Sequence, residues 1–402
     1  MQHHLLLEGE MPQRTIGSMP VAAKGFRPFF FLAGAFAVAI LPLWMLALLG
    51  LSNPGTYLDA VYWHAHEMVF GFAVAVIAGF LLTAVGNWTK RETLVGAPLL
   101  ALAALWLFGR IALSGADLFP RWLPAVADLA FLPALGVVLG RSLFVTNNKR
   151  NFVMLAILTA LFVANLTIHL DVLGVLPGWR RRGSLVAVDI VVLLMVVMAG
   201  RTFPMFTRNA TGQTSIRSLP ILDALSIGAM ALLLVLDAAA PDLALTAIVS
   251  AIAGVLAAVR TAHWGARRSF GTPLLWILHI GYLWIPVGLV LRALSAMTAS
   301  VPASIATHAL TVGAIGALTL GMMSRVALGH TGRMLTTSRT VVASFIVVTL
   351  AAIVRVSGPL VGAAHYRTTV FTAGTLWTFA FALFLYAYAR ILVSPRVDAK
   401  PG

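Results

Sequence analysis

The sequence predicts an all-α membrane protein with twelve transmembrane helices, and three observations support this fold class. Hydrophobic residues make up 60% of the 402 residues and charged residues only 10%, whereas a soluble domain typically has about 25% charged residues. Apolar runs of roughly 20 residues, the length that crosses a bilayer, recur along the chain. The polar stretches between them are short, which favours one integral membrane domain.

Allowing about 20 apolar residues for each span places the helices in order along the chain. The run that follows Arg27 is too long for the apolar region of a cleaved signal peptide, so it is predicted to be the first span. The twelve predicted spans are Phe29–Leu49, Val61–Val85, Leu94–Ser114, Trp122–Gly140, Phe152–Leu170, Leu185–Phe203, Leu219–Leu236, Leu243–His263, Pro273–Ser295, Ala303–Val326, Val341–Leu360 and Thr368–Val393. Residues 25–394 are predicted to form a single domain between an N-terminal tail (1–24) and a C-terminal tail (395–402).

The basic residues predict the orientation. If both termini are cytoplasmic, most of the 28 Lys and Arg residues fall on the cytoplasmic side, as the positive-inside rule requires. The same distribution accounts for the net charge of +15 without a nucleic-acid partner. The run Arg180-Arg181-Arg182 is an exception, because it falls on the outer side.

The chain has no cysteine. This excludes disulfides, thiolate-bound zinc, iron–sulfur clusters and covalently attached c-type haem. A metal would therefore have to be bound by His, Met or oxygen ligands.

The most informative motif is Trp63-His64-Ala65-His66-Glu67-Met68, at the start of the second span. An ionisable group in the centre of a span costs roughly 2.5–3.5 kcal/mol, so such groups are usually functional. Residues two apart on a helix point about 200° apart, so His64 and His66 should face different partners. His64 shares a face with Glu67 and Met68, which predicts a metal-binding face with a nearby carboxylate.

Further candidate ligands lie in other spans. His308 precedes Gly313 and Gly316, small residues that let a helix approach a flat cofactor or another helix closely. His279 lies in the ninth predicted span and His169 ends the fifth. Imidazole without thiolate suits haem iron or copper.

Two arginines and the glycines have competing interpretations. Arg110 and Arg292 could pair with haem propionates through bidentate hydrogen bonds. Alternatively, Arg110 or another buried cation pairs with Asp128 and Asp189 in a structural role. The glycines could be simple helix-packing positions, and any single buried histidine could be structural.

The sequence resembles the NnrS family of bacterial haem- and copper-containing inner-membrane proteins. The similar stretches cover nearly the whole chain, in order. They are Gly25–Phe30, Trp63–Met68, Gly79–Ala84, Asn87–Thr89, Gly109–Arg110, Gly200–Asn209, Leu278–Tyr282, His308–Gly313 and Met322–Arg325.

The resemblance implies a twelve-helix protein that binds haem b, with or without copper, and acts on nitric oxide. The prediction is a haem-dependent nitric oxide reductase that forms nitrous oxide and protects against nitrosative stress, in the context of denitrification. Its site would lie in the periplasmic half of the bacterial inner membrane. One of His66, His279 or His308 would be the axial haem ligand, and electrons would come from a quinol or a cytochrome.

In this hypothesis Glu67 delivers protons, because burial favours a protonated carboxyl group that can act as an acid. A copper ion bound by histidine, with His64 as a candidate ligand, could assist the coupling of two nitric oxide molecules. Two other classes stay open. The protein could sequester nitric oxide or metal without turnover, or it could be a secondary transporter, although residues 1–200 and 201–402 show no convincing repeat.

Overall fold

The computed structural model describes residues 19–52, 57–241 and 243–400. Most of the predicted N-terminal tail, residues 1–18, therefore lies outside the described part. Within the described ranges, twelve helices are long and apolar enough to cross a membrane, and there is no strand. The predicted fold class is confirmed, and the chain is a multi-pass membrane protein.

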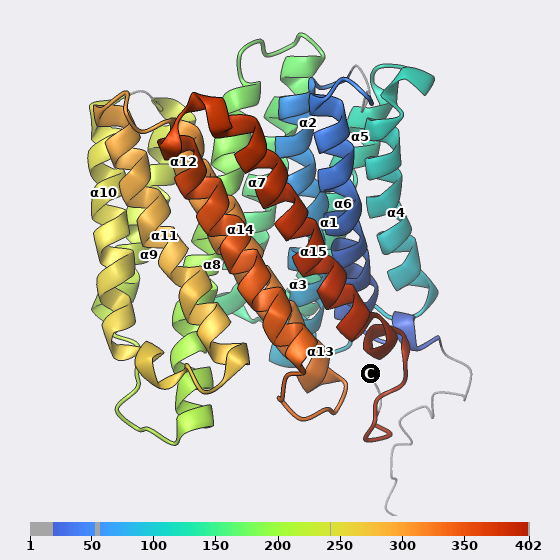
Figure 1. Ribbon diagram of the computed structural model, residues 1–402. Coiled ribbons are helices and arrows are strands. Elements are labelled where there is room, and N and C mark those ends of the chain that lie inside the picture. The colour runs from blue at the N-terminus through green and yellow to red at the C-terminus, as the bar shows by residue number, and fades with distance from the viewer. Residues whose placement is uncertain (1–18, 53–56, 242, 401–402) are drawn as a thin grey trace, which may run out of the picture.

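The helices form one bundle whose members alternate in direction (Figure 1). Their bounds are α1 (Phe26–Leu48), α2 (Ala60–His66), α3 (Val74–Thr89), α4 (Ala97–Ser114), α5 (Leu123–Leu129), α6 (Phe131–Val145), α7 (Val153–Val172), α8 (Arg180–Thr211), α9 (Pro220–Ala239), α10 (Ala244–Val259), α11 (Pro273–Met297), α12 (Ala303–His308), α13 (Ala317–His330), α14 (Arg339–Val361) and α15 (Tyr366–Val393).

Two spans contain a wide, π-helical segment. The second span consists of α2, the π-helical segment Glu67–Ala73 and α3, and the tenth consists of α12, the π-helical segment Ala309–Gly316 and α13. In each case the segment begins directly after a histidine, His66 or His308. Such segments are rare and frequently mark functional sites, which draws attention to these two spans.

Several helices extend beyond the apolar runs that predict them. The sixth span was expected over Leu185–Phe203, but α8 begins at Arg180 and ends at Thr211. The extra first turn is stabilised because the Asp171 carboxylate accepts from the Arg180 backbone and guanidinium nitrogens at 2.9–3.1 Å. This contact, with Arg182 stacked on Trp179, gives part of the unusual arginine run a structural role.

The two ends of the described chain meet at one end of the bundle. The Arg27 guanidinium, on the first turn of α1, donates to the Leu392 carbonyl at 3.0 Å and to the Ser394 carbonyl at 2.6 Å. These are carbonyls at the end of α15 that no helical N–H satisfies. An even number of spans places both ends on the same side, at the lower end in Figure 1. That this side is cytoplasmic stays a prediction.

Candidate functional site

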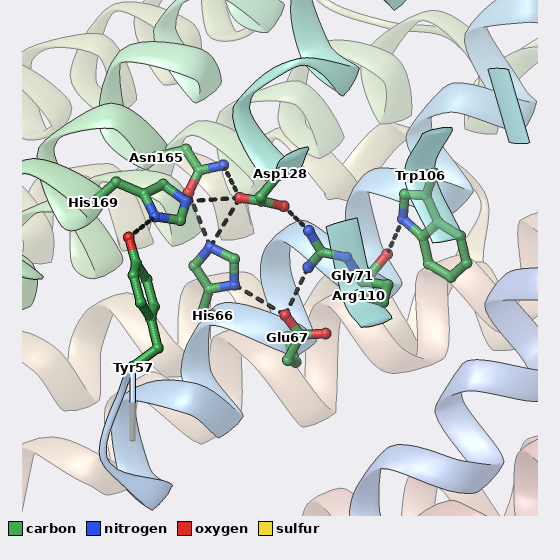
Figure 2. Close-up of polar contacts among 9 residues, drawn as sticks. All are labelled: Tyr57, His66, Glu67, Gly71, Trp106, Arg110, Asp128, Asn165 and His169. Carbon is green, nitrogen blue, oxygen red and sulfur yellow. Dashed lines mark hydrogen bonds and ion pairs between the residues drawn. The ribbon is translucent and has the colours of Figure 1, made fainter. Parts of the chain in front are cut away.

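A buried polar network lies at the upper end of the bundle, where α2 and α5 begin and α4 and α7 end (Figures 1 and 2). Its side chains are at most 8% exposed. We call it the polar network, and its members are Tyr57, His66, Glu67, Arg110, Asp128, Asn165 and His169.

Arg110 holds the two carboxylates of the network together. Its guanidinium donates to Glu67 Oε1 at 2.7 Å and pairs with Asp128. Asp128 Oδ2 also accepts from the Asn165 amide at 2.6 Å and lies 2.9 Å from His169 Nε2. Arg110 therefore pairs with carboxylates of its own chain. This agrees with the structural interpretation of Arg110 and not with a contact to a haem propionate.

His66 lies between oxygen atoms on both sides (Figure 2). Its Nδ1 is 3.1 Å from Glu67 Oε1, and its Nε2 is 2.9 Å from Asn165 Oδ1 and 3.3 Å from Asp128 Oδ2. Because the Asn165 amide nitrogen donates to Asp128, its oxygen must face His66. A hydrogen atom on His66 Nδ1 or on Glu67 Oε1 would complete that contact.

Tyr57 closes the network at its outer edge. Burial raises the pKa of its hydroxyl, so the group stays protonated and can donate to His169 Nδ1, 2.8 Å away. His169 then carries its proton on Nε2 and donates to Asp128. The ligand atoms of His66, Asp128 and His169 lie within 4.8 Å of one another, so the same three residues could also hold a metal ion.

A second site is a cavity of about 280 Å³ lined by residues of the first, second, sixth, tenth, eleventh and twelfth spans. We call it the histidine cavity. Its walls include His64, Met68 and Leu185, with His308 and Arg355 also facing it. The aromatic part of its wall consists of Trp44, Tyr62, Phe72 and Trp377.

The polar atoms around the histidine cavity are poorly satisfied. His64 stacks on Trp44 with ring centroids 4.0 Å apart. Buried nitrogens of His64 (Nδ1), Arg355 (Nη1) and the indoles of Trp44 and Trp377 have no hydrogen-bond partner within the described ranges. His308 Nδ1 donates to the Ser304 carbonyl at 2.6 Å, which leaves Nε2 unprotonated in the neutral ring and able to bind a metal.

The structure therefore separates the predicted site residues into groups. His64 and His308 line one cavity, whereas His66, Glu67, Arg110 and His169 form the polar network. The expectation that His64 and His66 face different partners agrees with this arrangement. The expected shared face of His64 and Glu67 does not, because Glu67 lies with His66 in the polar network, although Met68 does line the cavity with His64.

The remaining predicted residues have other surroundings. His279 lies near the opposite end of the bundle, with Nε2 3.0 Å from the Thr207 hydroxyl, and it lines neither the histidine cavity nor the polar network. Arg292 pairs with Asp189 and Asp237. A Cβ atom on Gly313 would lie 2.5 Å from the Trp284 side chain, and one on Gly316 would lie 2.5 Å from Trp377. Both glycines thus pack against indole rings.

Sequence reasoning missed several residues of these sites. Asn165 and Arg355 were detectable, since each is a polar residue inside an otherwise apolar run. Tyr57, Trp44 and Trp377 carried no such signal, because aromatic residues are common near the ends of membrane spans.

Comparison with known families agrees with the motifs quoted above. The family model described as NnrS protein matches residues 20–396, nearly the whole chain. The chain belongs to the NnrS family. Membership suggests a role in nitric oxide metabolism or response, and NnrS proteins are generally associated with haem or metal. A search of curated proteins finds no match.

Proposed function

We propose that this NnrS-family chain is a haem-dependent nitric oxide reductase whose haem is held in the histidine cavity. The observation that carries the proposal is that His64 and His308, from spans far apart in the sequence, line one cavity around which several buried nitrogens have no partner among the described residues. Buried polar atoms without partners are rare in proteins and call for an explanation, such as a ligand.

The residues of the histidine cavity fit a haem group. An imidazole nitrogen of His64 or His308 would hold the iron, and the indole rings of Trp44 and Trp377 would provide flat apolar walls. The Arg355 guanidinium would bind a carboxylate through Nη1, which has no partner among the described residues. The free volume of about 280 Å³ is small for a macrocycle. Binding would therefore require His64 to leave its stack on Trp44, which frees its ring as a ligand.

When bound, haem would supply the iron that takes up nitric oxide and passes electrons to it. The overall reaction consumes two nitric oxide molecules, two electrons and two protons, and forms one nitrous oxide and one water. The apolar wall would exclude bulk water from the site, which favours binding of an uncharged diatomic gas.

The polar network would store one of the two protons that the reaction needs, in the contact between His66 Nδ1 and Glu67 Oε1. Glu67 would release this proton and be reprotonated through His66. Glu67 Oε2 is buried and has no partner in the part of the chain described, so a second polar group could bind there. A copper ion bound by His66, Asp128 and His169 would bring a positive charge next to the two carboxylates.

A second candidate function is nitric oxide or metal binding without turnover. One observation favours it: Glu67 does not line the histidine cavity, so the stored proton is not adjacent to the cavity. In this function, the site would bind its ligand and release it unchanged.

The test is an absorption spectrum of the purified protein, followed by gas analysis. The proposal predicts a Soret band that shifts with nitric oxide, and nitrous oxide formation when dithionite supplies electrons. A haem-loaded protein that binds nitric oxide and forms no nitrous oxide would favour the second candidate. Colourless protein, after expression with added haem precursor, would reject both haem assignments.

A further inference from the structure

A larger cavity lies beside the histidine cavity at the same end of the bundle. Its volume is about 940 Å³, and it is lined by residues of α8, α10, α11 and α12. We call it the lateral cavity. It shares Leu185, Val188 and Thr307 of its wall with the histidine cavity, together with Arg181 and Ser304. The two cavities therefore adjoin across a wall of a few side chains.

The lateral cavity opens towards lipid. Ile248 and Ile252 of α10 are part of its wall and are 56% and 50% exposed. They lie in α10, which is at the edge of the bundle in Figure 1. A ligand that reaches this cavity sideways has to be soluble in the bilayer.

A charged group gives the cavity a polar end. Arg292 and Asp189 line it, with Arg292 Nη1 3.2 Å from Asp189 Oδ1, and Arg292 also pairs with the buried Asp237. Two carboxylates face this one guanidinium, and Arg181 also lines the cavity. Oδ2 of Asp237 is buried without a partner among the described residues. The carboxylates can accept a hydrogen bond from a hydroxyl group of an uncharged ligand.

We propose that the lateral cavity binds a quinol, the electron donor of the proposed reductase. A hydroquinone combines the required properties: an apolar ring and tail that partition into lipid, and hydroxyl groups that donate to a carboxylate such as Asp189. A volume of 940 Å³ lies in the range of about 300–1,000 Å³ that is typical for sites of small molecules and cofactors.

The electron balance fits the proposed function, on which this assignment rests. Oxidation of one hydroquinone to the quinone breaks two O–H bonds and releases two electrons and two protons. The two electrons match those consumed when two nitric oxide molecules form nitrous oxide and water. The electrons would cross the shared wall at Leu185 and Val188. The Asp189–Asp237 pair would accept the two protons in turn and release each to water at the end of the bundle where the cavity lies.

The primary experiment measures binding of a quinol analogue, 2-heptyl-4-hydroxyquinoline N-oxide, by the quenching of its fluorescence. The full-length protein in nanodiscs is compared with Ala247→Trp, which fills the lateral cavity, and with Ala258→Trp. Ala247 lines the cavity, whereas Ala258 lies on the same helix, is exposed and does not line it. We expect at least tenfold weaker binding for Ala247→Trp and unchanged binding for Ala258→Trp.

A second variant, Asp189→Asn, tests the carboxylate separately from the shape of the cavity. We expect the rate of haem reduction by a short-chain quinol to fall at least tenfold, while reduction by dithionite is unchanged. Equal binding of the analogue by Ala247→Trp and the unmodified protein would overturn the assignment. So would a change in co-purified phospholipid without a change in analogue binding, because the cavity would then be a lipid site.

These measurements use no nitric oxide, so they separate the two proposals. If the protein binds the analogue and is reduced by quinol but forms no nitrous oxide with any reductant, the quinol site is supported and the reductase function is rejected. If it forms nitrous oxide with dithionite but neither binds the analogue nor reacts with quinol, the reductase function is supported and the quinol site is rejected.

Discussion

The polar network and the histidine cavity both include residues of the motif Trp63–Met68, but they differ in how many of their polar atoms have hydrogen-bond partners. In the polar network nearly every nitrogen and oxygen has a partner within hydrogen-bond distance. Around the histidine cavity, nitrogens of His64, Arg355, Trp44 and Trp377 have none within the described ranges. Satisfied groups can store charge and protons, whereas unsatisfied groups around a cavity indicate a place for a ligand.

The largest effect is expected where the network balances its charges. Arg110→Met removes the cation between Glu67 and Asp128 and leaves two buried carboxylates without it. The free energy of unfolding should fall by about 3–5 kcal/mol, the usual cost of breaking a buried ion pair from one side. Thermal unfolding in detergent measures this change. The triple variant Arg110→Met, Glu67→Gln, Asp128→Asn should recover much of the loss, and a triple variant as unstable as the single one would contradict the charge argument.

The next effect separates ligand histidines from structural ones. His308→Ala should lower the haem content at least tenfold, because the hydrogen bond from Nδ1 to the Ser304 carbonyl leaves His308 Nε2 available as a ligand. Haem content per protein is measured by the pyridine haemochrome assay. His279→Ala is the matched control, since His279 also lies in a span but bonds to Thr207 and does not line the cavity. Equal haem loss in both variants would indicate a general folding defect.

A smaller effect tests how closely the wall of the histidine cavity is packed. Gly316→Ala would place a Cβ atom 2.5 Å from Trp377, so this indole must move. We expect a loss of about 1–3 kcal/mol in stability, typical of overpacking, and a several-fold lower haem content. Gly136→Ala is the control, because its Cβ would meet no atom within 4 Å. Normal haem binding by Gly316→Ala would show that Trp377 does not shape the haem site.

The smallest effect concerns the edge of the polar network. Tyr57→Phe removes the hydroxyl 2.8 Å from His169 Nδ1, and a typical hydrogen bond contributes about 0.5–1.5 kcal/mol. The unfolding temperature should fall by a few degrees while haem content stays the same. Loss of haem in Tyr57→Phe would mean that the two regions are coupled more tightly than their separate hydrogen bonding indicates.

The sequence predicts the spans well, because the length of an apolar run follows directly from the thickness of the bilayer. It also separates His64 from His66, since helical geometry alone sets that angle. The partners of Arg110 and the location of His279 could not be derived, because they depend on which helices become neighbours. The participation of Asn165 and Arg355 was missed for the same reason, although their polarity inside apolar runs was visible.

The π-helical segments after His66 and His308 limit which sequence changes these two spans can tolerate during evolution. Each such segment accommodates an extra residue in its turn, and one residue corresponds to a rotation of about 100° around the helix axis. Loss of a single residue from Glu67–Ala73 would return the span to a regular helix and swing His64 away from the position it holds relative to α3. The spacing between each histidine and the helix that follows is therefore as much a part of the site as the histidine itself, and insertions or deletions there should be tolerated less well than substitutions.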